Sequence, residues 1–266
     1  DVLRPWVSSV DYSADVPIGA GILRQLADVY RKVRNTSRYL LGNLHDFNPA
    51  SDAIPVAELP LLDRWMLQRT AEVMDEITEA FESFEFFRFF QLLQNFCVTD
   101  LSNFYLDIAK DRLYVSAPAD QRRRSCQTVM ALIIERLAGL IAPVLCHMAE
   151  DIWQNLPYQV EETSVFHRGW PTVPSDWHNT ELSAPIQQLR ELRAAVNKVL
   201  EDCRGRQELG ASLEASVRLE ARSPELQTAL TWLSENGDPE VDGLRDWLLV
   251  SQLQIGGEPW AELLAS

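Results

Sequence analysis

The residues that could bind or transform a ligand include one regularly spaced set of cations. Arg31, Arg34 and Arg38 recur at intervals of three and four residues, so they share one face of a predicted helix. Asn35 and Tyr39 adjoin them. Cations at this spacing can follow a phosphate backbone, while an amide and an aromatic ring can bind or stack on an unpaired base. The spacing alone is equally compatible with a solvated helix face.

Motifs for a metal or a phosphate cofactor are incomplete. His147 and Glu150 lie three residues apart on a predicted helix. A dinuclear metal site in a helical bundle needs this pair on two helices, with carboxylates from the others. None of the four histidines completes such a set, so we expect His147 to be a core or boundary residue. Gly19 and Gly21 precede a helix but lack the third glycine and the Lys-Ser/Thr of a phosphate-binding loop.

Candidates for acid-base and nucleophilic catalysis are also weak. Asp107 and Asp111 are one helical turn apart, as paired carboxylates would be. Lys110 and Arg112 lie beside them and favour a surface ion-pair cluster instead. Cys126 follows three arginines that could lower the pKa of its thiol, yet no histidine is close in sequence to act as a base.

Charge is unevenly distributed along the chain. The 266 residues include 39 acidic and 24 basic residues, a net charge of -15, which argues against indiscriminate coating of nucleic acid, DNA included, or of membranes. Residues 21–45 nevertheless hold five basic residues and one acidic residue, and residues 110–124 hold five basic and two acidic. A local basic stripe therefore lies in an acidic chain, whose remainder would repel RNA and favour one docking orientation.

Features of compartment and processing favour the cytoplasm. The four cysteines form no CxxC pair, so we expect reduced, mostly buried thiols. The sequence begins without a methionine or the apolar core of a signal peptide, and we expect it to be a piece of a longer protein. No apolar run reaches the roughly 18 residues of a membrane span, so no membrane partner is expected.

Hydrophobic periodicity predicts the helices that must position these residues. Four long helices are predicted, at 22–42, 61–84, 86–114 and 119–153, the last with a break near Pro143. Short connectors between long helices are typical of an antiparallel bundle. Pro5 cannot occupy a helix interior, so the first short helix is predicted to begin at or after Arg4, before a loop at 11–19.

The C-terminal part has a different pattern. The Pro- and Trp-rich segment 157–177 predicts a hinge, and a fifth helix follows at 185–204. Alternating apolar residues then predict strands at 215–220 and 247–255, with a short helix at 224–233 between them. The expected fold is mainly α, an antiparallel helical bundle with a small C-terminal α/β appendage.

Four longer segments are distinctive when taken together: WVSSVDYSAD at 6–15, VYRKVRNT at 29–36, FYLDIAKDRLY at 104–114 and AEDIW at 149–153. Together they resemble bacterial-type isoleucyl-tRNA synthetases, which are class I aminoacyl-tRNA synthetases. The resemblance is strongest up to about residue 172. It implies a stem-contact segment at 1–20, a helical anticodon-binding bundle at 21–177, and a C-terminal helix with a small α/β junction subdomain at 178–266.

The resemblance also implies partners and site residues. The expected partners are the anticodon stem-loop of isoleucine tRNA and the catalytic domain of the same polypeptide. Charge, spacing and family position together give seven candidate RNA-binding residues: Arg31, Arg34, Asn35, Arg38, Tyr39, Lys110 and Arg112.

The family's chemistry depends on parts that do not occur in these 266 residues. ATP and Mg²⁺ act at the HIGH and KMSKS motifs, and misacylated tRNA is hydrolysed in an inserted editing domain. The parent would be an isoleucine–tRNA ligase, while this chain is expected to be non-catalytic and to hold no cofactor. Many bacterial members end in a cysteine-ligated zinc module, and the CxxC that it requires does not occur here.

Two further interpretations belong to other functional classes. A helical adaptor could bind a protein through the aromatic residues of 86–114 or through Trp153, Trp170 and Trp177. Aromatic residues at helical spacing more often fill the core of a bundle. A metal-dependent bundle enzyme is the third interpretation, and it depends on the incomplete His147 and Glu150 pair.

Overall fold

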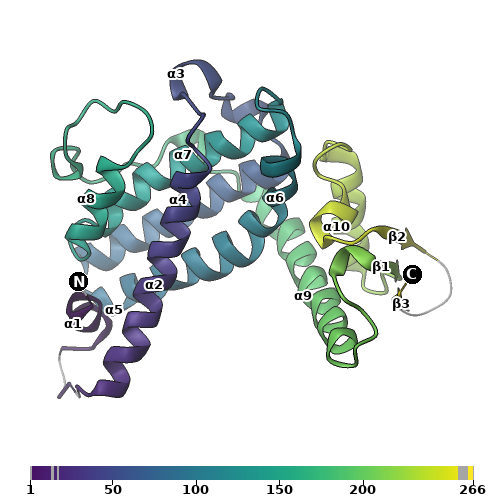
Figure 1. Ribbon diagram of the computed structural model, residues 1–266, viewed down its shortest axis with the longest axis horizontal. Coiled ribbons are helices and arrows are strands. Elements are labelled where there is room, and N and C mark those ends of the chain that lie inside the picture. The colour runs from purple at the N-terminus through teal and green to yellow at the C-terminus, as the bar shows by residue number, and fades with distance from the viewer. Residues whose placement is uncertain (1, 13–14, 17, 257–262, 266) are drawn as a thin grey trace. The chain divides into compact units, whose positions relative to one another are not determined.

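The computed structural model describes residues 2–12, 15–16, 18–256 and 263–265, and it is mainly helical (Figure 1). It contains two compact units, which we describe separately. The first comprises residues 1–59 and 66–178, and the second comprises 60–65 and 179–266. The predicted mainly α fold with a small C-terminal α/β appendage is confirmed. Among the described residues, no helix combines the length and apolar character needed to cross a bilayer.

The first unit is a bundle in which α2 contacts several other helices. Its α-helices are α1 (Leu3–Ser9), α2 (Ala20–Gly42), α3 (Pro49–Asp52), α4 (Leu61–Glu82, whose first residues belong to the second unit), α5 (Phe86–Asn95), α6 (Leu106–Val115), α7 (Gln121–Ile141) and α8 (Cys146–Gln154). The 3-10 turns are η1 (Val56–Glu58), η3 (Val165–His167) and η4 (Ser175–Trp177). Leu26, Val33 and Leu40 recur every seven residues and bury one face of α2, which packs on α1, α5, α7 and α8.

Helix α1 begins at Leu3, one residue before the predicted start at or after Arg4. Pro5 is the third residue of this helix and therefore lies in the first turn. Backbone N–H groups of the first turn have no intrahelical acceptor, so the missing donor of proline costs no hydrogen bond there. The predicted loop at 11–19 falls partly on residues 13–14 and 17, which are outside the described residues.

The continuous helix predicted at 86–114 is interrupted by a π-helix, η2 (Phe96–Tyr105), which joins α5 to α6. The Ser102 hydroxyl donates to the Cys97 carbonyl five residues earlier, at 2.8 Å. The Thr36 hydroxyl of α2 lies 2.9 Å from the Ser102 hydroxyl and 3.4 Å from the same carbonyl. These contacts connect the π-helix η2 to α2 and fix how the two helices pack at this point.

The segment 157–177 is irregular, as predicted, but it is packed on the first unit, and the boundary between the two units follows it at 178/179. Trp153 donates from Nε1 to the Glu162 carbonyl at 2.9 Å, and Trp170 donates to the Thr78 hydroxyl at 3.0 Å. Trp177 is 2% exposed, with the Arg136 guanidinium 4.6 Å from its ring centroid. An indole ring buries apolar area and can also donate a hydrogen bond. Tryptophans can therefore hold this segment on the first unit although it lacks regular secondary structure.

The C-terminal end of α2 is tied to α7 through Asp46. Arg123 donates from Nη1 and Nη2 to the two Asp46 carboxylate oxygens, at 2.5 and 2.9 Å. Gln127 donates to the same carboxylate at 2.8 Å, and Arg124 donates to the Asp46 carbonyl at 2.9 Å. The bonds from Arg123 hold the pKa of Asp46 well below its usual range, against the opposing effect of burial.

The second unit combines a long helix with a small sheet. It contains α9 (Ser183–Gly205), α10 (Pro224–Asn236), α11 (Leu244–Leu248), the strands β1 (Ala215–Leu219), β2 (Gln252–Ile255) and β3 (Leu263–Ala265), and the turns η5 (Thr180–Leu182) and η6 (Ser212–Glu214). β1 is central, parallel to β2 and antiparallel to β3, with Val217 opposite Leu253 and Leu263.

The strand predicted at 247–255 is correct only for its last four residues. Leu244, Trp247 and Leu248 are buried together on one face of α11, where helical spacing brings them side by side. Leu249 has a φ of 55°, a left-handed conformation that ends the helix. The chain can then enter β2 at Gln252.

Candidate nucleic-acid interface

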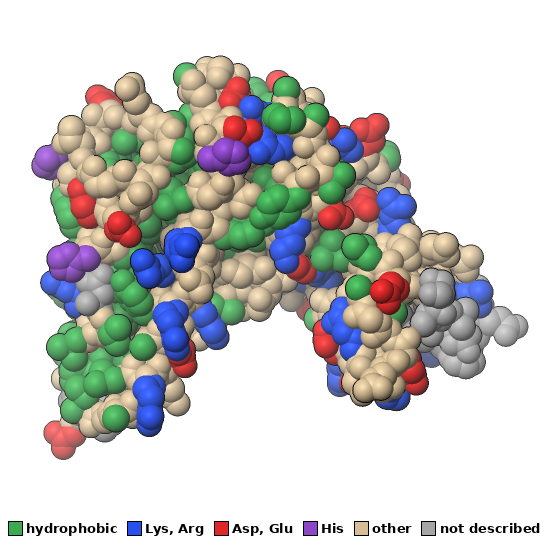
Figure 2. Space-filling view, viewed as in Figure 1, with side chains coloured by type: hydrophobic (Ala, Val, Ile, Leu, Met, Phe, Trp, Pro, Cys, Tyr) green, Lys and Arg blue, Asp and Glu red, His purple; other side chains and the backbone are tan. Residues whose placement is uncertain are grey.

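Basic side chains gather along the outward face of α2 (Figure 2). The exposed cations of this helix are Arg24, Arg31, Lys32, Arg34 and Arg38. They lie opposite the face that Leu26, Val33 and Leu40 bury, because the helical period sorts the two classes of residue. The residues of the predicted basic stripe are therefore exposed together on the side of α2 that faces away from the core.

Ion pairing distinguishes the predicted cations from one another. Arg31 bonds Asp28, and Lys110 bonds Asp107 at 2.8 Å, each with a carboxylate three residues earlier. Arg112 is only 8% exposed and has an interaction partner within the fold, so it is not the surface cation that we expected. Within the described part of the chain, Arg34 and Arg38 have no carboxylate within 4.0 Å.

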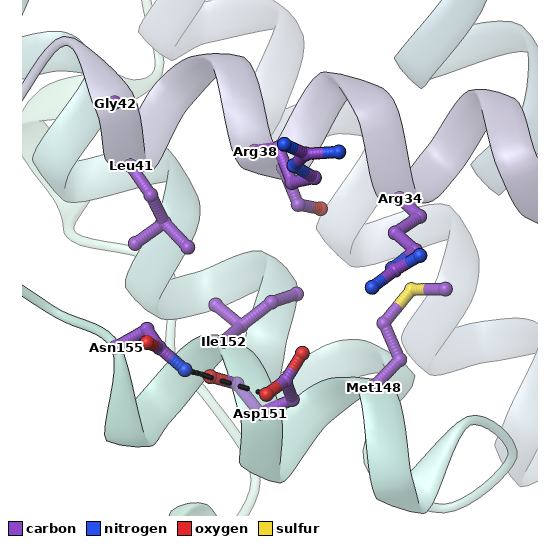
Figure 3. Close-up of a pocket in the computed structure, with 9 residues that line it drawn as sticks. Arg34, Arg38, Leu41, Gly42, Met148, Asp151, Ile152 and Asn155 are labelled. Atoms are coloured by element: carbon purple, nitrogen blue, oxygen red, sulfur yellow. Dashed lines mark hydrogen bonds between the residues drawn. The ribbon is translucent and has the colours of Figure 1, made fainter.

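Arg34 and Arg38 line a pocket of about 390 Å³ between α2 and α8, the α2–α8 pocket (Figure 3). Its lining comprises Arg34, Ser37, Arg38, Leu41, Gly42, Met148, Asp151, Ile152 and Asn155. The guanidinium groups of α2 face the polar side chains of α8 across the opening, as Figure 3 shows. Asn155 donates from Nδ2 to the Asp151 carbonyl at 2.7 Å and to its carboxylate at 3.3 Å. The pocket thus has a cationic wall and a wall rich in acceptors.

Asn35 and Tyr39 line a second pocket, of about 440 Å³, the α2–η2 pocket. Its lining comprises Lys32, Asn35, Thr36, Tyr39, Val98, Ser102, Asn103, Leu106 and Lys110. The bond between Thr36 and Ser102 lies in this lining, so the π-helix and α2 together set its shape. π-helical turns are frequently found at functional sites.

The hydroxyl of Tyr39 is buried and has no hydrogen-bond partner among the described residues. Burial is the main cause that raises the pKa of Tyr39 above its ordinary range, and the nearby Tyr114 phenol raises it further. The Tyr39 hydroxyl is therefore an unused donor beside the α2–η2 pocket.

We expect Tyr39→Phe to raise the free energy of unfolding by about 1 kcal/mol, because it removes a buried hydroxyl that has no hydrogen-bond partner among the described residues. Urea unfolding at neutral pH measures this change. Tyr12→Phe is the control, because its exposed hydroxyl makes one solvent-accessible hydrogen bond, to the Phe84 carbonyl at 3.2 Å, and it should change stability by less than about 0.5 kcal/mol. A loss of stability in Tyr39→Phe would show that the hydroxyl has a partner in solution.

The structure thus places five of the seven predicted residues in two pockets beside α2. Arg34 and Arg38 line the α2–α8 pocket, and Asn35, Tyr39 and Lys110 line the α2–η2 pocket. The remaining two, Arg31 and Arg112, line neither of them.

Sequence reasoning missed the wall that α8 contributes. Asp151 and Asn155 lie more than a hundred residues from α2 in the sequence. Their spacing of four residues on an exposed helix face was the one available signal. Lys32 was also missed, although it lies in the same basic run as the chosen arginines.

The residues considered for catalysis have other surroundings. Cys126 is fully buried, whereas His147 is exposed rather than in the core or at its boundary as expected. Glu150 accepts hydrogen bonds from Ser164 at 2.9 Å and from the Val165 backbone at 3.1 Å, which attach the following loop. Within the described residues, no three His, Cys, Asp or Glu side chains are grouped to hold a metal ion. The four cysteines form no disulfide with one another, and three of them are buried.

The aromatic surface proposed for an adaptor is largely interior. Trp153 and Trp177 are 3% and 2% exposed, and Phe89 and Phe104 of the aromatic helix are buried as well. Trp170 remains partly exposed but packs against Phe81, with ring centroids 5.2 Å apart. The core-filling interpretation is therefore confirmed for Trp153, Trp177, Phe89 and Phe104, whereas Phe86, Phe87 and Phe90 are half-buried and Tyr114 is exposed.

Comparison with known proteins places these features in a family. A family model described as the anticodon-binding domain of tRNA ligase matches residues 63–219, more than half of the chain. An isoleucine–tRNA ligase of Parasynechococcus marenigrum (strain WH8102) is 90% identical over all 266 residues, which cover 27% of its length. Isoleucine–tRNA ligases of Prochlorococcus marinus (strain MIT 9313) and Synechococcus sp. (strain CC9311) are 79% and 80% identical over the same residues.

The similarity extends beyond the matched family model at both ends. The chain spans about a quarter of the length of these relatives, and their alignments include α2 and the two pockets. The C-terminal residues, where the resemblance was expected to weaken, are aligned as well. From the family match and the helical fold, the chain belongs to the anticodon-binding domains of tRNA ligases.

Proposed function

We propose that this chain binds the anticodon stem-loop of isoleucine tRNA, as the anticodon-binding part of an isoleucine–tRNA ligase. The names of the relatives support the choice of tRNA. The observation that carries the proposal is the pair Arg34 and Arg38, one helical turn apart and without carboxylate partners among the described residues.

The surface of α2 suits an unpaired RNA loop. Two guanidinium groups on the helix can contact successive phosphates, and a pocket lies on each side of them. Proteins that recognise RNA sequence usually bind unstacked bases, whose edges and faces are both accessible. Pockets of about 390 and 440 Å³ are large enough for a base.

The α2–η2 pocket offers donors to a base or a ribose. The Asn35 amide and the Lys32 ammonium belong to exposed residues of its lining, while the buried Tyr39 hydroxyl would reach RNA only after a side-chain shift. Lys110 is paired with Asp107, and both groups are partly accessible, so RNA can compete for this exposed ion pair at low cost.

The chemistry of the whole protein is part of the proposal. Ligation of isoleucine to tRNA with ATP and Mg²⁺ would occur in the portion of the longer protein outside this chain, in the cytoplasm. The contribution of the present residues is to hold the anticodon arm. We assign no metal or nucleotide cofactor to them.

Titration of a fluorescent stem-loop into the 266-residue chain tests the proposal. The probe carries the anticodon arm of isoleucine tRNA, and the control has the same stem with an unrelated anticodon. We expect tighter binding of the first probe, and weaker binding of both at 200 mM than at 50 mM salt. Equal affinity for the two probes, or no salt-sensitive binding, would reject the function.

A further inference from the structure

We propose that Arg69 is a positioning residue for the α2–η2 pocket, because its ion pair with Asp100 holds η2 in its π-helical form. This form sets the rotation of the residues that follow Asp100, and with it the places of Asn103 and Lys110 in the pocket lining. Arg69 itself lines neither of the two pockets, so its effect on RNA would pass through η2. The inference rests on the proposed function, since this pocket is part of the candidate interface.

Two neighbouring helices hold η2 from opposite sides. On the side of α2, the Ser102 hydroxyl lies 2.9 Å from the Thr36 hydroxyl. On the side of α4, Arg69 donates from Nε to the Asp100 carboxylate at 2.9 Å. Asp100 and Ser102 are two residues apart, which is roughly half a helical turn, so their side chains point to opposite sides of η2. The contact with α2 lies in the pocket lining, and the contact with α4 lies behind it.

The ion pair on the side of α4 is the stronger of the two contacts. The Asp100 side chain is 6% exposed and the Arg69 side chain is 25% exposed, so solvent screens the pair only partly. Hydrogen bonds between ions are about twice as strong as those between neutral groups. Arg69 also donates from Nη1 to Glu72 at 2.9 Å, and Glu76 lies 3.6 Å from the same nitrogen, so α4 itself fixes the guanidinium in place. A buried carboxylate is costly to separate from its cation, which favours the position that η2 gives to Asp100.

The backbone bonding of η2 is coupled to this position. The Leu106 N–H donates to the Leu101 carbonyl five residues earlier, where an α-helix would use the residue four earlier. A change of η2 to α-helical bonding would place fewer residues in each turn, so side chains of η2 and α6 would rotate relative to α2 and α4. Asp100 would turn away from Arg69, and Lys110 would turn away from the α2–η2 pocket. The ion pair opposes this change and thereby keeps Lys110 beside the candidate RNA surface.

Hydrogen exchange of backbone amides tests the claim about η2 without RNA. In Arg69→Gln, we expect the amides of residues 96–105 to exchange about tenfold faster or more than in the native chain, with a smaller change in α7. Arg88→Gln is the matched control, because Arg88 also bonds two carboxylates, Glu79 and Glu85, but lines neither pocket. This control should keep the native rates in residues 96–105. Unchanged exchange in Arg69→Gln, or equal acceleration in η2 and α7, would overturn the inference.

A double-mutant cycle with the anticodon stem-loop tests the consequence for binding. In the native chain, Lys110→Ala should lower the affinity and reduce the slope of log affinity against log salt by about 0.7. In the Arg69→Gln chain, the same replacement should change neither quantity, because Lys110 has already left the pocket. Asp100→Asn should abolish the effect of Lys110→Ala in the same way. It leaves no buried carboxylate unpaired, so it serves if Arg69→Gln does not fold.

The possible outcomes separate this inference from the proposed function. A full effect of Lys110→Ala in both variant chains would mean that Arg69 only stabilises the bundle, and the inference would be wrong. A native chain that binds the stem-loop but does not respond to Lys110→Ala would also overturn the inference, and it would leave the proposed function intact. Failure of the native chain to bind the stem-loop would reject the proposed function itself, and the positioning role with it.

Discussion

Replacing Arg34 and Arg38 together with alanine should lower the affinity for the anticodon stem-loop about a hundredfold at 50 mM salt and about tenfold at 200 mM. Each phosphate contact releases counterions from the RNA, so it contributes about 0.7 to 0.9 to the slope of log affinity against log salt. The double variant should therefore have a slope smaller by about 1.4 to 1.8. Both arginines are exposed, and the fold does not depend on them for an ion pair.

The control must remove a positive charge without removing a phosphate contact. Arg88→Ala does so, because Arg88 already bonds Glu79 at 3.0 Å and Glu85 at 2.7 Å. Its salt slope should equal that of the native chain. Arg31→Ala should have a smaller effect than either free arginine, since Asp28 partly neutralises Arg31. An unchanged slope in the double variant would remove Arg34 and Arg38 from the interface.

Asp46→Ala should lower the free energy of unfolding by about 2–3 kcal/mol at pH 7. It leaves Arg123, whose side chain is 10% exposed, without its paired carboxylate, and it removes the acceptor of Gln127. Urea unfolding followed by circular dichroism measures the difference. Asp28→Ala removes an exposed carboxylate instead, and it should change stability by less than about 0.5 kcal/mol.

The contribution of Asp46 should depend on pH in a defined direction. Its pKa in the folded state lies below the unfolded value of about 3.9, so the unfolded chain binds more protons in this range. The stabilisation is complete above about pH 5 and is lost as the pH falls through the folded-state pKa. The gap between the native chain and Asp46→Ala should therefore be smaller at pH 3 than at pH 7. A constant gap would mean that the carboxylate charge does not contribute.

Helical periodicity was sufficient to predict most of the bundle. The boundaries of α2 and α9 agree with prediction within two residues, because each helix has a clear apolar stripe and ends at a glycine. The π-helix was not predictable, since it depends on the packing of Ser102 against Thr36, which lies 66 residues away in the sequence. The same holds for 157–177, where proline and tryptophan predicted a hinge but Trp177 is buried against the first unit.

For the candidate site, the sequence predicted a helix whose cations are exposed, but it could not separate the paired cations from the others. Asp28 and Asp107 precede Arg31 and Lys110 by three residues, so both ion pairs were detectable from spacing. The burial of Arg112 and the facing wall with Asp151 depend on tertiary structure. Periodicity describes one helix at a time and therefore cannot reveal what lies across a pocket.

The π-helix η2 makes the length of this segment as important as its composition. Each residue of an α-helix turns the chain by about 100°, so a single deletion or insertion in residues 96–105 would rotate all of α6 by that angle. Lys110 would leave the α2–η2 pocket, and buried Ile108 and Leu113 would turn away from the core. Substitutions in η2 can be accommodated one side chain at a time, whereas a change of chain length would disturb the candidate RNA-binding surface and the core together.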